Sequence, residues 1–348
     1  MSEKIFKWSV VGAGPAGIMA VAKLIDAGVP AQQILWLDPH FQVGDFGRLW
    51  SQVSGNTPVQ SFIDCLQFIE CIPYGARPFP MHQLVPSDTC QLSYMADILQ
   101  HYSDELRPLT VHHQANLQAL TLKNNMWQLT SDQNEVFEAQ KVVLATGAIP
   151  KMLSLSDADR NIPLEIALSP DKLAGAIQPD DTIAVFGSSH SAILILKNLV
   201  DLSAAKIINF YLEPCRYALP MGDWILYDNT GLKGKAAKWA KTYVDGKWPD
   251  NLQRLYSNKE NIEAELPKCQ KIIHATGFST KLNFTIEGVD AHKYDPYSGI
   301  IAPGLFGFGI AFPHHSLTPF GNVTVNVGLR KFKDHLQKVL PIWLQYDA

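Results

Sequence analysis

The sequence predicts an α/β protein with two Rossmann-like dinucleotide-binding domains, one inserted into the other. Three observations support this fold class: a glycine-rich turn at residues 12–17, a similar turn at residues 187–192, and Ala-Thr-Gly turns at residues 145–147 and 275–277. A chain of 348 residues is long enough for two such domains.

The first turn has the complete spacing of a dinucleotide-binding loop. After a run of strand formers, Gly12, Gly14 and Gly17 follow the pattern G-x-G-x-x-G. The first glycine permits a tight turn, the second lets the backbone approach a pyrophosphate, and the third lets the helix pack closely on the strand. Pro15 suits the first helical turn and, with Ala16, completes the predicted loop. We therefore predict a cofactor site here.

An acidic residue follows the next predicted strand, "QILWLDP" (residues 33–39). Asp38 lies about twenty residues after the turn, where a carboxylate can bind a ribose hydroxyl. The alternative is a solvated carboxylate at a strand end. Gly28 is expected to end the intervening helix.

The middle of the first domain is predicted to contain a helix and a β-meander. The helix covers residues 92–106, and short strand-like pieces separated by polar turns follow it. These pieces are residues 109–114, 117–123, 126–131 and 135–140.

The two Ala-Thr-Gly turns each follow a buried apolar strand. Because ligands bind at the carboxyl ends of the strands in parallel α/β sheets, these turns are expected to contact cofactors. The predicted contacts are Thr146 and Gly147 in the first turn, and Thr276 and Gly277 in the second.

The second glycine-like turn keeps the spacing but not every glycine. Gly187, Ser189 and Ala192 occupy the three positions. Serine and alanine are small, so the backbone can still approach a phosphate, though less freely than with glycine. Ser188 and Ser191 add hydroxyl groups beside the N–H groups of a helix start, which bind anions. The alternative is a tight turn without a ligand, but its place after an intact site favours a second nucleotide site.

Two dinucleotide sites in one chain predict electron transfer between their cofactors. The natural pair is a tightly bound FAD and an exchangeable nicotinamide, with hydride passing from the second to the first. Arg216 follows the second strand of the inserted unit, where a cation can pair with a 2′-phosphate. This favours NADPH, and the alternative is a surface arginine. Residues 1–150 and 279–348 would form the FAD domain, and residues 151–278 the NAD(P)H domain.

Composition and charge limit the kinds of partner that we expect for this protein. A formal net charge of −4 gives no reason to expect nucleic acid, and no apolar run reaches the roughly 18 to 20 residues that span a bilayer. Glycines interrupt the apolar run near the N-terminus, which argues against a signal peptide and for a cytoplasmic protein.

Cys65 and Cys71 have five residues between them, a spacing that favours ordinary thiols over a redox pair. His112 and His113 would face opposite sides of one strand, so no metal site is predicted.

The stretch "VGDFGRLWSQVSGNTPVQSF" (residues 43–62) resembles the flavin-containing monooxygenases. That family has a glycine–tryptophan turn after its first nucleotide site, which Gly47 and Trp50 match. An Asn-Thr-Pro-like segment then comes close to the flavin, and Asn56 begins the matching segment here. Gln60 resembles a glutamine that lies by the flavin ring in related N-hydroxylases.

The resemblance implies that Asn56, Gln60 and Trp50 act at a flavin. In this family reduced flavin adds O2 to form a C4a-hydroperoxide, which survives only where water is excluded. An amide such as Asn56 can donate a hydrogen bond to it, although the alternative is that this residue only shapes the turn. One oxygen atom would pass to a nitrogen or sulfur nucleophile of a small-molecule substrate.

The C-terminal part is similar to the same family. "RYALPMGD" resembles its NADPH-binding loop, and Gly309 is followed by Ile310 rather than by the acid of thioredoxin-reductase-like proteins. Gly309 is therefore expected on the flavin side. His314 and His315 are expected to be loop histidines.

The sequence also departs from the family. Residues 161–181 lack the F-x-G-x-x-x-H signature, and His190 stands where the family has Asn or Gln. Residues 226–266 contain few strand-like runs, so we expect a shortened second domain. These departures keep two alternatives open: a reductase or oxidase without oxygen insertion, and a non-catalytic flavin or dinucleotide binder. A homodimer also stays open.

Overall fold

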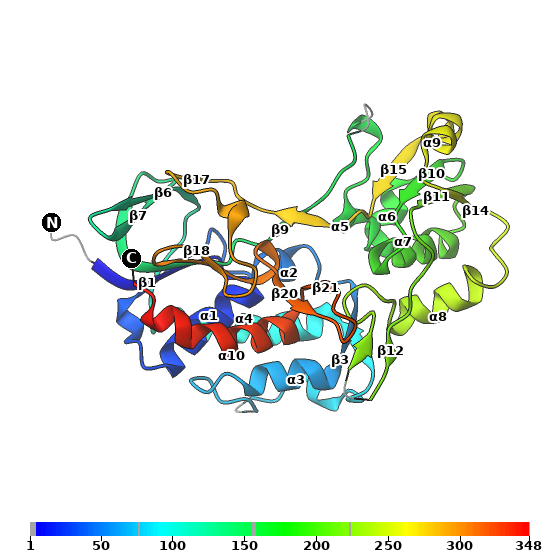
Figure 1. Cartoon of the computed structure of the whole chain (residues 1–348). Helices are drawn as coiled ribbons and strands as arrows, with labels where there is room; N and C mark the ends of the chain where they lie inside the picture. Colours follow the sequence, from blue (N-terminus) through cyan, green and yellow to red (C-terminus); the bar gives the residue numbers. More distant parts are fainter. Residues whose placement is uncertain (1–4, 76, 155–157, 223, 348) are drawn as a thin grey trace.

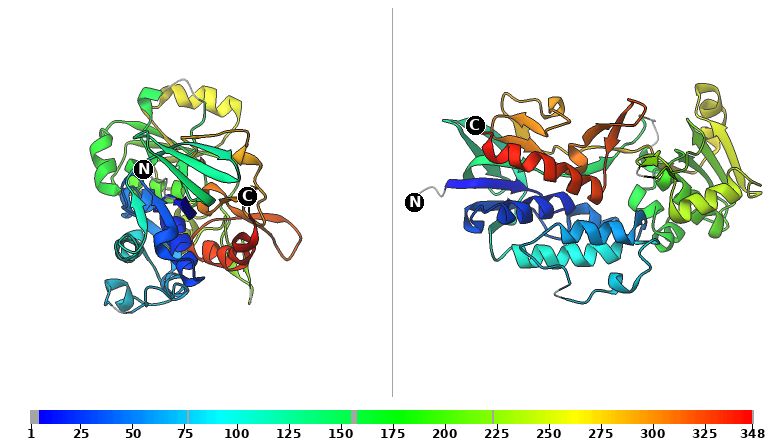
Figure 2. Two further views of the ribbon diagram at one scale, coloured as in Figure 1. Left: turned by 90° about the vertical axis from the view of Figure 1, so that its left-hand side faces the viewer. Right: turned by 60° about the horizontal axis from the view of Figure 1, so that its bottom comes forward.

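The computed structural model describes residues 5–75, 77–154, 158–222 and 224–347. Two α/β bodies lie side by side, and the second lies at the end of the molecule away from the N-terminus (Figures 1 and 2). The first contains a nine-stranded sheet and the second a four-stranded sheet.

The first sheet combines a parallel nucleotide-binding core with a meander. The core runs β5-β2-β1-β8, all parallel, and the meander continues from β8 through β7, β6 and β17, while β19 and β18 join at the carboxyl half of β8. Its strands are β1 (Ile5–Val11), β2 (Ile34–Leu37), β5 (Val111–His113), β6 (Leu117–Lys123), β7 (Met126–Ser131), β8 (Val136–Leu144), β17 (Thr285–Ile286), β18 (Ile300–Ala302) and β19 (Leu305–Gly307).

Two details of the predicted meander are wrong. Residues 109–114 do not join it, because β5 pairs in parallel with β2 at the far edge of the sheet. Residues 135–140 do not form a separate strand, because β8 continues to Leu144. Its first half pairs antiparallel with β7, and its second half is buried between β1 and β19. Burial along β8 changes from half-exposed in its first half to complete in its second half, so in the sequence this one strand resembled two.

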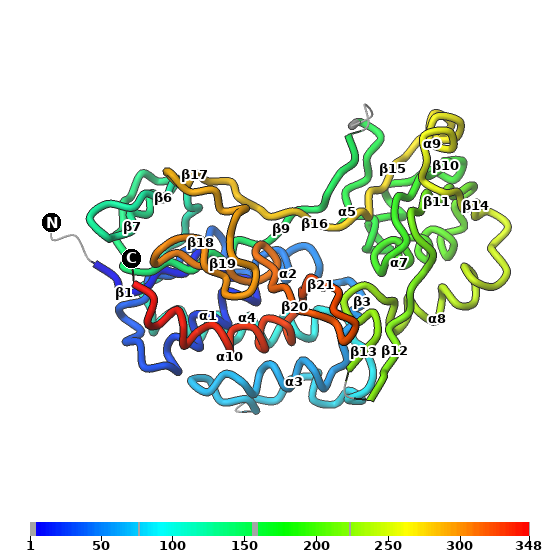
Figure 3. Tube along the Cα trace, viewed as in Figure 1, coloured from blue at the N-terminus to red at the C-terminus, as the bar shows by residue number. Residues whose placement is uncertain are grey.

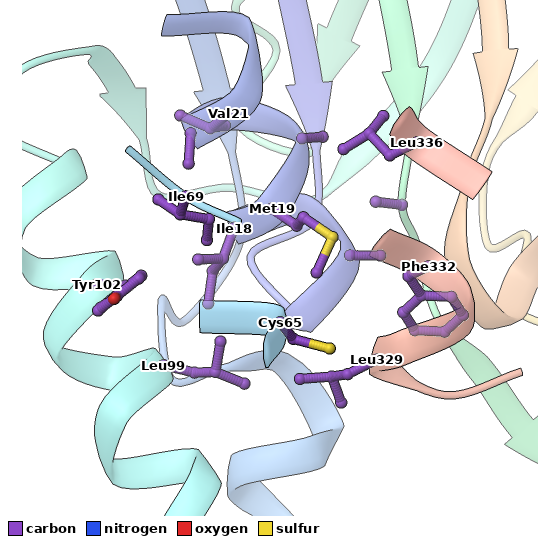
Figure 4. Close-up of a cluster of buried hydrophobic side chains, with 14 of the residues drawn as sticks. Ile18, Met19, Val21, Cys65, Ile69, Leu99, Tyr102, Leu329, Phe332 and Leu336 are labelled. Atoms are coloured by element: carbon purple, nitrogen blue, oxygen red, sulfur yellow. The ribbon is translucent and has the colours of Figure 1, made fainter. Parts of the chain in front are cut away.

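Four helices cover one face of the first sheet (Figure 1). They are α1 (Pro15–Asp26), α3 (Val59–Gln67), α4 (Leu92–Leu106) and α10 (Leu329–Gln345). Figure 4 shows Ile18 and Met19 of α1 among side chains from the other three helices, including Cys65, Leu99 and Leu336. The predicted helix at residues 92–106 is confirmed by α4.

The second body is a complete four-stranded unit, contrary to the expected shortening. Its order β14-β11-β10-β15 repeats the order β5-β2-β1-β8 of the first core, and all its pairs are parallel. The sequence of β14 hid it, because this edge strand is half-exposed and carries Gln253 and Arg254. The elements are α5 (Leu164–Ala167), α6 (Pro170–Ala176), β10 (Thr182–Phe186), α7 (His190–Asp201), β11 (Lys206–Tyr211), α8 (Gly234–Tyr243), β14 (Leu252–Tyr256), α9 (Lys259–Glu265) and β15 (Lys271–His274).

Two chain crossings join the bodies (Figure 3). They pair antiparallel as β9 (Ala148–Pro150) and β16 (Phe278–Thr280). The predicted domain boundaries, after residue 150 and before residue 279, fall in this pair.

Two hairpins make a further contact between the bodies. One is β12 (Leu219–Pro220) with β13 (Ile225–Leu226), and the other is β20 (His314–Leu317) with β21 (Val323–Asn326). Asn229 Nδ2, just after the first hairpin, donates to Asn326 Oδ1 at 3.0 Å.

The remaining short elements surround these bodies. They are α2 (Gly44–Arg48), β3 (Ser54–Pro58), β4 (Thr89–Gln91) and 3-10 turns at Ala31–Gln33, Pro80–Gln83, Ala158–Arg160, Leu266–Lys268, Ala291–Lys293 and Gly309–Ala311.

Candidate functional site

The first glycine turn lies between β1 and α1, and its three glycines do different things. Gly12 has φ +109°, and a Cβ there would lie 2.3 Å from the carbonyl oxygen of Ala145. A Cβ on Gly17 would lie 1.9 Å from the carbonyl oxygen of Gly12, so both glycines are required by packing within the chain. A Cβ on Gly14 would come no closer than 3.9 Å to the protein, at Val43. A Cβ on Gly14 would thus meet the protein only at ordinary van der Waals distance, so packing does not require this glycine, and its predicted role is the approach of the pyrophosphate.

Asp38 fixes the loops around this turn. Its Oδ2 accepts a hydrogen bond from the Ala13 N–H at 2.7 Å, and its Oδ1 accepts from the N–H groups of His40 and Phe41 at 2.8 and 2.7 Å. A carboxylate has about four acceptor positions, so one is left for a ribose hydroxyl. The ribose contact stays a prediction.

The N-terminus of α1 is suited to an anion. Pro15 is its first residue, Ala16 and Gly17 are in its first turn, and no side chain caps it. The first N–H groups of a helix lack partners within the helix and carry its positive dipole end. Gly309 packs closely against this first turn, because a Cβ on Gly309 would lie only 2.6 Å from Cβ of Ala16.

The first Ala-Thr-Gly turn contains an unsatisfied polar group. Oγ1 of Thr146 is buried and has no hydrogen-bond partner, whereas buried hydroxyls are normally paired. The next residue, Gly147, has φ +79°. In the second turn, Oγ1 of Thr276 donates to the carbonyl of Lys151 at 2.8 Å, and the Gly277 carbonyl accepts from the Lys151 N–H. The Gly147 carbonyl accepts from the Lys281 N–H at 3.1 Å, so both turns are bonded to a crossing chain, and they differ in that the hydroxyl of Thr146 is unpaired.

The second turn repeats the plan of the first. Gly187 has φ +126°, and a Cβ there would lie 2.5 Å from the carbonyl oxygen of Ala275. Ser189 precedes α7 as its N-cap without making a side-chain cap bond, and it is exposed. Ser188 and Ser191 on either side are half-buried. The side-chain amide of Asn209, on β11, donates to the carbonyl of Gly187 at 2.8 Å and holds the loop in place.

The strand β3 lies against this second turn. Nε2 of His190, the first residue of α7, donates to the carbonyl of Ser54 at 3.1 Å. Asn56 lies two residues further along β3, half-buried, and its Oδ1 accepts a weak 3.4 Å hydrogen bond from Thr57. The structure therefore brings Asn56 to the junction of the two bodies. The sequence offered one signal for His190, its departure from the family residue.

The other two predicted flavin residues lie in different surroundings. Trp50 makes an edge-to-face contact with Phe278, with ring centroids 5.9 Å apart, and packs on the core of the second body. Gln60 is exposed on α3, and its Nε2 donates to Asp64 at 2.8 Å. Contacts of either residue with a flavin stay predictions.

Arg216 lies in the loop after β11 but already has partners. It forms an ion pair with Glu213 at 2.7 Å, and its guanidinium lies 5.3 Å from the ring centroid of Tyr227. Contact with a 2′-phosphate stays a prediction for this residue.

The cysteines and histidines outside this region show no redox or metal arrangement. Burial raises the pKa of the Cys65 and Cys71 thiols to about 12, so they are poor nucleophiles. Among the described residues no three His, Cys, Asp or Glu side chains are grouped to hold a metal ion. No helix within the described ranges is long and apolar enough to cross a bilayer.

Two strand–turn–helix units of the same design, joined by a two-stranded crossing, are the arrangement of two-domain dinucleotide-binding oxidoreductases. No family model matches the chain. Monooxygenase AgnR1 of Paecilomyces divaricatus is 32% identical to it, over 96% of this chain and 97% of that protein. The chain therefore belongs to that monooxygenase family, and the predicted membership of the flavin-containing monooxygenase-like flavoproteins is confirmed.

Solved structures share the fold at low identity. The flavin-containing monooxygenase of Stenotrophomonas maltophilia has 14% identity over 99% of both chains, with a TM-score of 0.66. Bacillithiol disulfide reductase Bdr (YpdA) of Staphylococcus aureus has 13% identity over 98% of this chain and 99% of that chain, with a TM-score of 0.64. OTEMO in complex with FAD and NADP has 15% identity over 88% and 81%, with a TM-score of 0.59. The predicted fold class is confirmed, and the chain is a flavin-dependent oxidoreductase of the monooxygenase type.

Proposed function

We propose that this protein is an FAD-dependent, NADPH-using monooxygenase acting on a nitrogen or sulfur nucleophile. The observation that carries the proposal is the place of β3, which bears Asn56 and contacts the second phosphate turn through the bond from His190 to Ser54. We expect a strand that contacts the second turn in this way to lie close to the nicotinamide cofactor. The domain division at residues 150 and 279 is part of the same proposal.

The first turn fits FAD. Gly14 is not required by packing, Thr146 has a buried hydroxyl without a partner, and α1 begins without a side-chain cap. Gly12, Gly14, Ala16 and Gly17 would hold the pyrophosphate, and Asp38 has an acceptor position left for the ribose.

The second turn fits NADPH. The N-terminus of α7 has no side-chain cap, and Ser189 and Ser191 supply hydroxyls beside its first N–H groups. The exposure of Ser189 suits a cofactor that binds and leaves. Gly187 and Ser188 would complete the phosphate contacts.

A flavin held by Gly12, Gly14, Ala16 and Gly17 would supply the O2 activation that the family resemblance implies. The balance is substrate, O2, NADPH and a proton giving oxygenated substrate, water and NADP⁺. The chain's own contribution is to hold Asn56 on β3 at the junction of the bodies. There its amide N–H can donate to an oxygen without acting as an acid.

Rapid mixing tests this function and separates its rivals. The flavin-loaded protein is mixed with NADPH without oxygen, and flavin absorbance is followed; oxygen is then added. Reduction followed by a long-lived adduct spectrum is expected. Reduction followed by immediate reoxidation with stoichiometric H2O2 would instead establish a reductase or oxidase, and a flavin that stays oxidised would establish a non-catalytic binder.

A homodimer is also proposed, and the β20–β21 hairpin supports it. Val323, Val325 and Val327 are 57%, 47% and 41% exposed, whereas Thr324 and Asn326 between them make hydrogen bonds within the chain. An outward apolar face of this kind marks an interaction surface. Light scattering should give a dimer mass that Val325→Lys reduces to a monomer. A monomeric unmodified protein would overturn the proposal.

A further inference from the structure

The two nucleotide turns can be aligned through their hydrogen bonds. The Gly12 N–H donates to the carbonyl of Leu37 at 2.7 Å, and the Gly187 N–H donates to the carbonyl of Phe210 at 2.9 Å. The residue after Leu37 is Asp38, and the residue after Phe210 is Tyr211. Tyr211 therefore occupies, in the second body, the position of the ribose-binding acid.

The loss of an acid at this position matters for cofactor choice. A carboxylate here binds the 2′-hydroxyl of NAD and repels the 2′-phosphate of NADP, which instead needs a nearby arginine. Tyr211 has no charge to repel a phosphate. The second body therefore lacks the carboxylate that would select against NADPH.

A cation lies beside Tyr211. The guanidinium carbon of Arg254, on β14, lies 4.5 Å from the centroid of the Tyr211 ring. Nε of Arg254 donates to Oδ1 of Asn209 at 2.8 Å, and Nδ2 of Asn209 donates to the carbonyl of Gly187 at 2.8 Å. Arg254 is therefore connected to the phosphate turn through one amide side chain. It lies near the carboxyl edge of the sheet, where ligands bind.

Arg254 has unused hydrogen-bonding capacity. Its Nη2 is buried without an oxygen acceptor among the described residues, and on that side the side chain interacts with the Cys215 thiol, a weak acceptor. A buried charged donor without a strong acceptor is unfavourable, and a phosphate oxygen is its strongest complement. Cys215 is adjacent, with its Sγ 3.8 Å from the carbonyl of Ser188. The neighbouring carboxylate, Asp245, accepts from the hydroxyl of Tyr217.

Arg216 is less suited to this role. It is exposed, and its charge is balanced by Glu213. The Glu213 carboxylate beside it competes with a phosphate for the guanidinium and repels a second anion.

We propose that Arg254 and Tyr211 form a binding site for an adenosine 2′-phosphate, with Asn209 positioning the arginine. The site rests on the proposed NADPH function and makes it specific: Arg254 binds the 2′-phosphate, and the Tyr211 ring lies against the adenosine. Selectivity for NADPH over NADH comes from β14 rather than from the loop after β11.

Calorimetry with the flavin-loaded protein tests this site without turnover. The probes are adenosine 2′,5′-bisphosphate and adenosine 5′-monophosphate, which differ by the 2′-phosphate. The unmodified protein should prefer the bisphosphate by at least about tenfold, and Arg254→Gln should lose most of that preference while binding the monophosphate as before. Arg216→Gln should keep most of it.

Tyr211→Asp provides a second variant that leaves Arg254 in place. The added carboxylate should weaken bisphosphate binding by about tenfold or more and should raise the relative rate of flavin reduction by NADH. A preference that survives Arg254→Gln, or a loss of both nucleotides in equal proportion, would overturn the site. If the unmodified protein binds neither nucleotide, the proposed function itself fails; equal binding of the two refutes only this inference.

Discussion

Nε2 of His190 donates a 3.1 Å hydrogen bond to the carbonyl oxygen of Ser54, joining the first turn of α7 to β3. Burial lowers the pKa of His190 below its ordinary value, and the nearby Lys233 acts in the same direction. The ring is therefore neutral at physiological pH, with its proton on Nε2 and its buried Nδ1 without a partner. This one bond couples the second nucleotide turn to the strand that bears Asn56.

Replacing His190 should slow hydride transfer rather than flavin binding. In His190→Ala the contact between α7 and β3 is lost, and a hydrogen bond of about 1 kcal/mol corresponds to a several-fold fall in the rate of flavin reduction by NADPH. Anaerobic stopped-flow absorbance measures that rate, and the bound-flavin content should be unchanged. His190→Gln, which retains an N–H donor, should recover much of the rate. An Ala variant as fast as the unmodified protein would show that the bond has no positioning role.

Asn56→Ala should leave flavin reduction intact and shorten the life of the oxygen adduct. The expected loss is about tenfold in adduct lifetime, because the proposed hydrogen-bond donor to the oxygen adduct is removed. Oxygen mixing after anaerobic reduction measures it. Asn116→Ala is the matched amide control, since Asn116 is exposed, paired with Asp132 and outside the candidate site. Equal effects of the two variants would remove Asn56 from the mechanism.

Substitutions at three glycines should separate ligand binding from folding. Gly14→Val should fold but purify without flavin colour, because a Cβ there would meet the protein only at ordinary van der Waals distance and the side chain would occupy the place where the pyrophosphate is expected. Gly12→Ala should lose about 2 kcal/mol or more of unfolding free energy, since its Cβ meets Ala145 and its φ is positive. Gly175→Ala, with nothing within 4 Å, is the control. A yellow, saturated Gly14→Val protein would show that the flavin site is misplaced.

The fold was predictable where local chemistry determines it. Gly12 and Gly187 both need positive φ and a close approach to a neighbouring strand, so the two turns marked the two bodies correctly. The segments 109–114 and 226–266 were misread because edge strands such as β5 and β14 are short and half-exposed. Their pairing depends on partners far away in sequence.

The site was predictable only in part. The two turns and Asp38 lie where the spacing predicted them, whereas Asn56 lies in strand β3 rather than in the Asn-Thr-Pro turn considered for it, and their cofactor contacts stay predictions. The only mark of His190 in the sequence is its departure from the family residue, and Arg254 has none, because their contacts with Ser54 and Asn209 arise only in the three-dimensional fold. An arginine in an edge strand gives no sequence signal by itself.

The stability of the protein should fall as the pH decreases below about 6.5. Burial, and then the charge of the neighbouring His314, lower the pKa of His335 from 6.5 to about 4. Its ring stacks on His314, with centroids 4.4 Å apart, and its Nε2 donates to the carbonyl of Tyr297 at 3.2 Å. Burial also lowers the pKa values of His190, His274 and His314. At a pH between the folded and unfolded pKa values of a histidine, the unfolded chain binds more protons than the folded chain. The free energy of unfolding is therefore highest above the unfolded pKa and falls progressively as the pH drops below it.

For His335 alone the loss approaches about 3 kcal/mol near its folded pKa. Urea unfolding at about pH 7.5 and about pH 5 measures the change in unfolding free energy. His335→Phe keeps a ring of similar size in the stack but cannot bind a proton, so its free energy of unfolding should depend less on pH than that of the unmodified protein. His292→Gln, at an exposed histidine, controls for the loss of a histidine as such. If His335→Phe and the unmodified protein lose equal stability over this interval, protonation of His335 is not the cause.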